Sequence, residues 1–448
     1  MKINYKLAAF AVALQFSCTR LLDEKPQKNL IVPTQLNELR AILDNTSQAM
    51  NLEPGLIELS SDDLVLDPDV LPRLFVQEVN SYLWADEIYG EEKAIEWGLL
   101  FNAVQYANVV LDQLLVVNKP PQEEQEWKDL EGSALFYRAY SYWSLTKTFC
   151  LAYTDKADKT LGLPLRYTGV ITNEIKRASL KDTFEFILAD LELATGLLGT
   201  SPEIVTRPSR EAAFALMAEV YLFMGEYTKS LEAAEKSLNI KSDLMDYNEL
   251  DIASINSFSR FNRETIFYSF MAPYLYQFED VVRVDPVLYR TYEENDLRKH
   301  LYYVERANFV EFKGSYTGTI EHFSGLSVDQ VMLTRAECLA RLGREAESLE
   351  VLNKLISTRW KTGEFVGLSP IAGKNTLDLV LEERRKSLVF RGVRWADLKR
   401  LNLDPRYAKD LHRVVNGKEY KLPAGSPKYA FPLSAQEINL TGMEQNPR

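Results

Sequence analysis

Apolar side chains recur every three or four residues along several long stretches of the chain, which is the spacing of an amphipathic α-helix. The clearest stretches lie within residues 214–238, where Gly225 separates two helical patterns. Residues 161–172 and 364–376 are instead interrupted by proline and glycine, and we predict that they are loops. The pattern therefore predicts helices that pack in antiparallel pairs and are joined by irregular segments.

One helical pair is repeated along the chain. Residues 214–238 and residues 332–355 place the same small residues in register, namely Ala218 with Ala336, Gly225 with Gly343, and Ser230 with Ser348. Small side chains at these positions let two helices approach closely, and the glycine ends the first helix. This is the ~34-residue helix-turn-helix unit of tetratricopeptide repeats. Residues 97–115 and 130–149 form a third, weaker unit.

The composition favours a large folded protein. The chain has 448 residues, of which 46% are hydrophobic and 11% aromatic, and this is ample for a packed core. Its formal net charge is -12. A surface this acidic repels nucleic acid and anionic lipid headgroups, so we predict no nucleic-acid partner.

The first residues have the order of a bacterial secretory signal. Lys2 and Lys6 precede an apolar run at residues 7–16, and Ser17 stands directly before Cys18. A run of this length is too short to span a bilayer, which takes roughly 20 apolar residues. We therefore predict a signal peptide at residues 1–17. The alternative is a cytoplasmic protein with an apolar first helix.

A cysteine at the predicted cut suggests a lipobox, in which the thiol of Cys18 receives diacylglycerol before cleavage. The departure from this pattern is that Gln15, and not leucine, stands three residues before the cysteine. An ordinary secretory cut therefore stays open. Loss of the two lysines would move the net charge to -14, so attachment would rest on acyl chains. Cys150 and Cys338 are predicted to be buried free thiols.

The last third of the chain carries a more particular string at residues 381–401, "LEERRKSLVFRGVRWADLKRL". We predict ion pairs at helical spacing between two acids and two bases, which are Glu382, Glu383, Arg385 and Lys386. Gly392 should break the helix, and Trp395 with Leu398 should form the apolar face of the next one.

Together with residues 429–447, this string closely resembles the C-terminal signature of the SusD/RagB family, which are surface nutrient-binding lipoproteins of Bacteroidetes. Residues 21–45 resemble the start of the mature chain in one branch of that family. A helix containing "ALFYRAYSYWSL" followed by "GLPL" at residues 162–165 also fits. The resemblance covers nearly the whole mature chain. It implies an all-α, SusD-like fold with tetratricopeptide-like helical hairpins and long irregular loops.

The resemblance also implies a function and a domain organisation. Family members capture oligosaccharides, or peptides in some cases, at the outer membrane, with a SusC-like TonB-dependent β-barrel as partner. It implies a lipid anchor at Cys18 and a location facing the cell exterior. We expect a lipidated tether at residues 18–30 and a single domain at residues 31–448. Its N-terminal part spans about residues 31–240 and its C-terminal part about residues 260–448.

Enzyme motifs are weak, so we predict no catalysis, no cofactor and no metal. Residues 367–375 imitate a phosphate loop, but five residues separate the glycines where four are required. The three histidines have no ligand spacing. The carboxylate pairs, Asp62 with Asp63 and Glu293 with Glu294, are interpreted as solvated charged turns, although such pairs can serve a glycosidase.

Sugars bind proteins largely through apolar C–H faces laid on aromatic rings. Residues 267–323 contain fourteen Phe or Tyr, about twice the chain average, and Pro273 interrupts them as in an exposed loop. A second ring-rich stretch is residues 82–97, in which Trp97 is predicted to cap or pack its helix. The predicted ligand-binding residues are Trp84, Tyr274 and Tyr276, with Tyr82 and Tyr89 as further candidates. For each ring the alternative is a place in the core.

A different class of function is also compatible with these patterns. A tetratricopeptide adaptor would hold a protein client and would have no transporter partner. Co-purification with a large β-barrel supports the nutrient-binding function, and a soluble client without such a barrel supports the adaptor.

Acylation of Cys18 predicts that Cys18→Ala leaves the membrane fraction and loses metabolic labelling by palmitate, because the variant has no thiol to modify. Fractionation and labelling that are unchanged in this variant would contradict the anchor.

Overall fold

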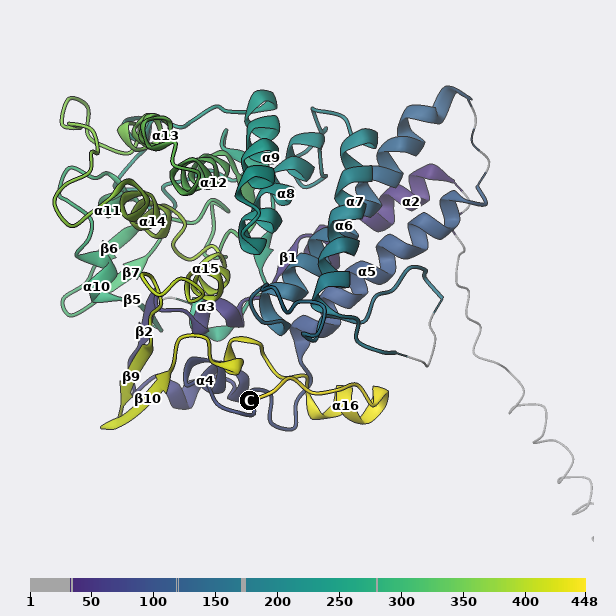
Figure 1. Ribbon diagram of the computed structural model, residues 1–448, viewed down its shortest axis with the longest axis horizontal. Coiled ribbons are helices and arrows are strands. Elements are labelled where there is room, and N and C mark those ends of the chain that lie inside the picture. Colours follow the sequence, from purple (N-terminus) through teal and green to yellow (C-terminus); the bar gives the residue numbers. More distant parts are fainter. Residues whose placement is uncertain (1–32, 34, 118, 120, 171–174, 279–280) are drawn as a thin grey trace, which may run out of the picture.

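Long α-helices pack side by side over most of the molecule (Figure 1). The computed structural model describes residues 33, 35–117, 119, 121–170, 175–278 and 281–448, so the signal peptide, the tether and Cys18 lie outside the described residues. Helices make up about 48% of the structure and the strands are short, which confirms the predicted all-α class. The helices are α2 (Leu36–Leu43), α3 (Leu56–Ser60), α4 (Val76–Tyr82), α5 (Ile95–Leu114), α6 (Glu124–Phe149), α7 (Leu180–Leu197), α8 (Arg210–Met224), α9 (Tyr227–Ile240), α10 (Pro286–Tyr289), α11 (Arg298–Leu301), α12 (Val328–Arg341), α13 (Glu345–Ser357), α14 (Thr376–Ser387), α15 (Arg394–Leu401) and α16 (Ala435–Thr441).

The two repeated hairpins, α8 with α9 and α12 with α13, share one contact that confirms their predicted register. The hydroxyl of Ser230 donates to the carbonyl oxygen of Ala218 at 2.8 Å. The hydroxyl of Ser348 donates to the carbonyl oxygen of Ala336 at 2.7 Å. All four residues are fully buried. The serine side chain is small, so the two helices approach closely. Its hydroxyl can then reach the carbonyl oxygen of the facing helix.

The C-terminal helices form around Gly392, whose φ of +68° is the left-handed conformation that glycine adopts easily. Trp395 and Leu398 on α15 are buried, as predicted. The expected pair of Glu383 with Lys386 is present at 3.0 Å. The other expected pair is wrong, because the remaining acid and base find partners outside the helix: Glu382 pairs with Lys374, and Arg385 pairs with Asp63 at 2.9 Å.

Short strands tie distant segments of the chain together. They are β1 (Leu52–Glu53), β2 (Leu64–Leu66), β3 (Thr265–Phe267), β4 (Phe270–Met271), β5 (Val282–Val284), β6 (Tyr303–Glu305), β7 (Val310–Phe312), β8 (Leu326–Ser327), β9 (Leu411–Val415) and β10 (Lys418–Leu422). The pair β1–β4 is parallel, and β2–β5, β3–β8, β6–β7 and β9–β10 are antiparallel. Pairing of β1 with β4 and of β2 with β5 fixes residues 52–66 against residues 270–284.

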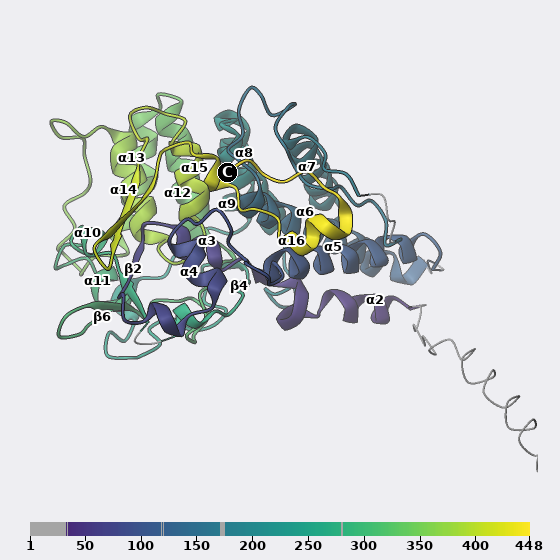
Figure 2. The ribbon, with the colours of Figure 1, turned by 90° about the horizontal axis from the view of Figure 1, so that it is seen from below.

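Both views place the β6–β7 hairpin with α10 and α11 at one end of the molecule and α2, α5, α6 and α7 at the other (Figures 1 and 2). One continuous apolar core runs through the described residues from Leu36 to Met443. Trp97 belongs to it, with its ring centroid 5.0 Å from that of Phe149, so its predicted packing role is confirmed.

Cys150 and Cys338 are buried free thiols, as predicted. Burial raises the pKa of Cys150 to about 11, so this thiol is protonated at neutral pH. In the part of the chain that the structure describes, no helix is both long enough and apolar enough to cross a bilayer.

The close helix contacts predict that Ala218→Leu or Ala336→Leu overpacks its hairpin and lowers the free energy of unfolding by about 1 to 3 kcal/mol. Urea denaturation measures this change. The control is Ala346→Leu, because Ala346 is exposed on α13 and should tolerate the larger side chain. Equal stability of all three variants would contradict the register.

Candidate functional site

A cavity of about 350 Å³ opens beside the β6–β7 hairpin, and we call it the hairpin cavity. Its walls come from residues 253–256, from Gln277 and Phe278, from the hairpin itself, and from residues 313–320. The hairpin lies at the left of Figure 1, next to α10 and α11. Most of this wall falls inside the ring-rich segment that the sequence analysis selected.

The hairpin sets one wall of the cavity. Val304 on β6 lies opposite Glu311 on β7, and Tyr303 lies opposite Phe312. Because side chains alternate between the two faces of a strand, Tyr303 turns into the core while Val304 and Glu311 line the cavity. The guanidinium of Arg306 donates to the Glu311 carboxylate at 2.8 Å, which holds both side chains in place.

Lys313 fixes the opposite rim of the hairpin cavity. Its ammonium group donates to the carbonyl oxygens of Ile252 at 2.7 Å and of Ser254 at 2.9 Å. Partial burial lowers the pKa of Lys313, and Asp251 acts in the opposite direction. The lysine therefore anchors residues 252–254 at the cavity mouth through two hydrogen bonds.

The third wall is a loop that is held by its own hydroxyl groups. Ser315 donates to the carbonyl oxygen of Glu321 at 2.6 Å and accepts from the backbone N–H of Phe323 at 2.9 Å. Thr317 donates to the same Glu321 oxygen at 2.7 Å. These bonds fix the loop before any ligand arrives, which reduces the entropy lost on binding.

Three apolar side chains at the rim of the hairpin cavity are exposed to solvent. The exposed fractions are 44% for Phe278, 74% for Ile255 and 49% for Ile320. Apolar surface beside fixed polar groups is typical of a site that covers the C–H faces of a ligand and orients it by a few hydrogen bonds. Arg306, Glu311 and Lys313 supply the polar groups here.

The structure buries all five rings that the sequence analysis selected. The exposed fractions are 3% for Tyr82, 5% for Trp84, 2% for Tyr89, 4% for Tyr274 and 0% for Tyr276. The expected exposure is therefore wrong. A part in ligand binding stays a prediction for these rings, and in this conformation their faces are covered by protein.

Pro273 does interrupt regular structure, but the segment that follows turns inward. The hydroxyl of Tyr276 donates to the carbonyl oxygen of Gly55 at 2.8 Å, and its backbone N–H donates to Glu78 at 2.8 Å. A Cβ at Gly55 would lie 2.8 Å from the Tyr274 ring, so the missing side chain makes room for that ring. The segment 55–78, distant in sequence, therefore covers both tyrosines.

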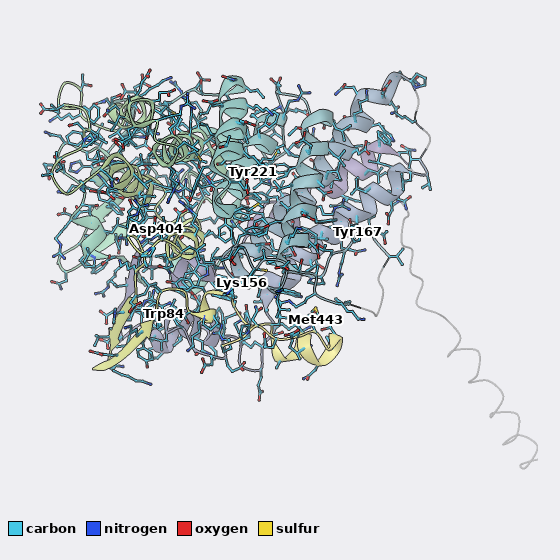
Figure 3. All side chains as sticks on the ribbon, viewed as in Figure 1. Trp84, Lys156, Tyr167, Tyr221, Asp404 and Met443 are labelled. Carbon is cyan, nitrogen blue, oxygen red and sulfur yellow. The ribbon has the colours of Figure 1, made fainter. Side chains whose placement is uncertain are left out.

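Trp84 and Tyr82 are buried against one cation. The guanidinium of Arg413, on β9, lies 3.8 Å from the Tyr82 ring centroid and 4.4 Å from the Trp84 ring centroid. The Trp84 indole donates to the carbonyl oxygen of Ser60 at 3.0 Å. Figure 3 shows Trp84 near α4 and the β9–β10 hairpin. Through Arg413, these rings join the segment at residues 82–84 to strand β9 instead of facing solvent.

Sequence analysis missed the exposed apolar residues of the hairpin cavity, although each had a signal. Phe278 stands directly before an acidic pair, where exposure is typical. Ile255 stands in "DIASINSFSR", a stretch rich in polar turn residues in which an isoleucine is unusual. Only the arrangement of the hairpin brings these residues together.

Other chemical candidates from the sequence have structural roles. Asn375, at the end of the imitation phosphate loop, caps α14 by accepting from the backbone N–H of Asp378 at 3.0 Å. Glu293 and Glu294 are exposed, as expected. The expectation for Asp62 and Asp63 is wrong, because both are largely buried and are paired with Arg394 and Arg385.

The histidines stay apart in the structure as in the sequence. His322 is fully buried, and burial lowers its pKa to about 3, so it is neutral. Within the described ranges, no group of three or more His, Cys, Asp or Glu side chains could hold a metal ion.

Comparison with known proteins covers most of the chain. Residues 20–222 match the family described as "Starch-binding associating with outer membrane", and residues 330–448 match the SusD family. The SusD-like protein P2 of Formosa agariphila is 22% identical over 422 aligned residues, which cover 79% of this chain and 81% of that protein.

Solved structures share the fold over nearly the whole chain. A SusD superfamily protein from Bacteroides thetaiotaomicron matches with a TM-score of 0.73 and 21% identity, covering 92% of this chain and 98% of that chain. A SusD-like carbohydrate binding protein from Bacteroides vulgatus matches with a TM-score of 0.70 and 16% identity, covering 92% and 97% of the two chains.

Burial of Tyr276 predicts a loss of stability when the ring is removed. Tyr276→Ala should lower the free energy of unfolding by about 3 to 5 kcal/mol, because it leaves a cavity in the core. Tyr276→Phe should cost only about 1 kcal/mol, for the lost hydrogen bond to Gly55. Urea denaturation of both variants measures the difference. A Tyr276→Ala variant as stable as the wild type would contradict the burial.

Proposed function

Because the chain belongs to the SusD/RagB family, we propose that it captures oligosaccharides in the hairpin cavity and delivers them to a SusC-like TonB-dependent transporter at the outer membrane. Carbohydrate binding is supported for SusD-like proteins as a class. The observation that carries the proposal for this chain is the hairpin cavity, which combines exposed apolar side chains with fixed polar groups at its rim.

The chemistry of the hairpin cavity suits a sugar. Phe278 offers an aromatic face, and Ile255 and Ile320 offer aliphatic surface for the C–H faces of a second ring. Arg306 and Lys313 are donors, and Glu311 is an acceptor for sugar hydroxyl groups. Because these polar side chains are already held by hydrogen bonds to the protein, little side-chain entropy is lost when a ligand binds.

A peptide ligand is the first alternative, because the same mixture of apolar surface and charged groups also fits a short peptide. A combined glycan and peptide array on the purified protein separates the two classes of ligand. Binding of glycans without peptides supports the proposal, and the reverse result assigns the protein to the peptide-binding branch of the family.

The transporter and the membrane anchor complete the proposed function. SusD-like proteins are surface proteins that associate with the outer membrane. We propose that diacylglycerol on Cys18 tethers the folded part and that the protein faces the cell exterior. Solubilised membranes should yield this protein together with a TonB-dependent β-barrel. A soluble protein client in place of the barrel would instead support the tetratricopeptide adaptor.

We propose that capture proceeds without catalysis, as expected for a family of substrate-binding proteins. The bound oligosaccharide should be recovered unchanged after prolonged incubation with the purified protein. Chromatography that detects shortened products would assign a hydrolytic activity instead.

The hairpin cavity predicts that Phe278→Ala weakens binding of the array-identified oligosaccharide by about 1 to 3 kcal/mol, by analogy with base stacking on aromatic side chains. Isothermal titration calorimetry measures the change. Because Phe278 is half-exposed, the free energy of unfolding should change by less than about 0.5 kcal/mol.

Phe75→Ala is the matched control, because Phe75 is exposed to a similar degree and does not line the hairpin cavity. It should bind as the wild type does. Wild-type affinity in the Phe278→Ala variant, or an equal loss in both variants, would contradict the assignment of the ligand site to this cavity.

A further inference from the structure

A second cavity, of about 190 Å³, has an unusual charge for so acidic a chain. It lies between the segment that follows α6, the C-terminal end of α15 and the turn that precedes α16, and we call it the lysine cavity. Its lining residues are Leu151, Ala152, Thr154, Lys156, Thr160, Lys399, Asn402, Leu403, Gly425, Ser426 and Tyr429. This set contains two lysines and no carboxylate. By contrast, the hairpin cavity includes Glu311.

The side-chain amide of Asn402 presents a free donor group. Its Oδ1 accepts from the backbone N–H of Lys409 at 2.9 Å. A backbone N–H can only donate, so the oxygen end of the amide is fixed on that side. Nδ2 is buried, and its only hydrogen bond among the described residues is a weak one to the Tyr429 hydroxyl. One N–H bond of Asn402 is therefore unused.

The hydroxyl of Tyr429 is a second unused group. The side chain is 2% exposed, and its ring centroid lies 4.7 Å from that of Trp395. The hydroxyl oxygen is buried and accepts only this weak hydrogen bond from Asn402, so its own proton has no acceptor within the described ranges. Burial raises the pKa of Tyr429 to about 12, and the neighbouring Asn402 amide opposes that shift, so the group is an O–H donor at neutral pH.

Lys399 and Lys156 add positive charge. The ammonium of Lys399 donates to the carbonyl oxygens of Lys147 and Cys150, each at 2.6 Å, at the end of α6. One of its three N–H bonds is left. Burial lowers the pKa of Lys399 to about 7, so this side chain is only partly protonated at neutral pH. Lys156, labelled in Figure 3, is exposed and forms no ion pair with any described residue.

Two carboxylates that act on the Tyr429 hydroxyl are already neutralised. Both lie outside the lining, and each is paired with a cation, Asp62 with Arg394 at 2.6 Å and Asp410 with Lys421 at 2.7 Å. These two carboxylates therefore add little negative potential at the Tyr429 hydroxyl.

The unused donors of Asn402 and Tyr429 match a ligand that accepts hydrogen bonds. A carboxylate has this property, whereas a water molecule also needs acceptors for its own hydrogens. Leu151, Ala152 and Leu403 give the cavity apolar walls that suit the carbon skeleton of the ligand. Because Lys399 is only partly protonated at neutral pH, a monoanion balances the charge of the lining better than a phosphate or sulfate dianion does.

We propose that the lysine cavity binds a small monocarboxylate, of about the size of one sugar acid, through the Asn402 amide, the Tyr429 hydroxyl and the two lysines. The lysine cavity shares no lining residue with the hairpin cavity, so this proposal does not rest on the proposed function.

Isothermal titration calorimetry of the full chain with sodium glucuronate, sodium acetate and glucose tests the proposal. Glucuronate and acetate should bind, and glucose should bind at least tenfold more weakly than glucuronate. Asn402→Asp should weaken glucuronate binding at least tenfold, because it replaces two donors by a negative charge and keeps the acceptor for Lys409. Tyr429→Phe and Lys156→Met should each weaken it several-fold.

The controls distinguish a loss of binding from a loss of folding. They also distinguish the lysine cavity from the hairpin cavity. Asn239→Asp makes the same change of charge at an exposed position of α9 and should bind glucuronate as the wild type does. Phe278→Ala should also leave glucuronate binding unchanged. Tyr429→Phe should melt close to the wild type, because the hydroxyl it removes accepts only a weak hydrogen bond from Asn402.

Three results would overturn the proposal. The first is the absence of binding heat with either carboxylate, which means a water-filled cavity only. The second is a glucuronate affinity no higher than that for glucose. The third is wild-type glucuronate affinity in Tyr429→Phe and Lys156→Met, which keep the test valid if Asn402→Asp does not fold.

Discussion

The guanidinium of Arg384 holds the helical framework together from inside. It donates to Asp397 on α15 at 2.9 Å, to Glu219 on α8 at 3.0 Å and to Thr334 on α12 at 3.0 Å. Removing an ion from water costs several kcal/mol, and this cost is offset only where every partner is in place. All of these Arg384 hydrogen bonds can form in only one arrangement of α8, α12, α14 and α15. In that arrangement the tetratricopeptide hairpins pack against the C-terminal helices. The short strands and the loops of both cavities are built on that arrangement.

A second buried arginine, Arg359, helps to fix one wall of the candidate ligand site. Arg359 donates to both carboxylate oxygens of Glu264, at 2.7 Å and 2.8 Å. Tyr316 donates to the same carboxylate at 3.0 Å. Because Tyr316 belongs to the loop that forms the third wall of the hairpin cavity, the charged network in the core fixes that wall. A buried ion pair thus fixes this loop, although its backbone is irregular. The ligand site can therefore be arranged before a ligand binds.

Much of the framework followed from local rules that act within one or two turns of helix. The spacing of apolar residues, the glycines that end α8 and α12, and the matched Ala218–Ser230 and Ala336–Ser348 contacts were all predictable. The ion pairs of α14 show where such rules end. Glu383 and Lys386 pair within the helix, but Arg385 prefers Asp63, more than three hundred residues away in the chain. The sequence pattern is compatible with a partner inside the helix and with a distant partner. Only the packed structure decides which of the two lies closer.

The sequence by itself determined the fold class, the repeat register and the ring-rich segment that supplies most of the wall of the hairpin cavity. The tertiary structure decided which side chains in that segment reach solvent. Tyr276 and Phe278 stand two residues apart in one ring-rich stretch, yet Tyr276 is fully buried and Phe278 is half-exposed. The difference arises because Gly55 and Glu78, brought in by a distant segment, bind the backbone and hydroxyl of Tyr276, whereas Phe278 lies beyond their reach. Exposure depends on what packs against a residue, and residues far away in the sequence supply that packing.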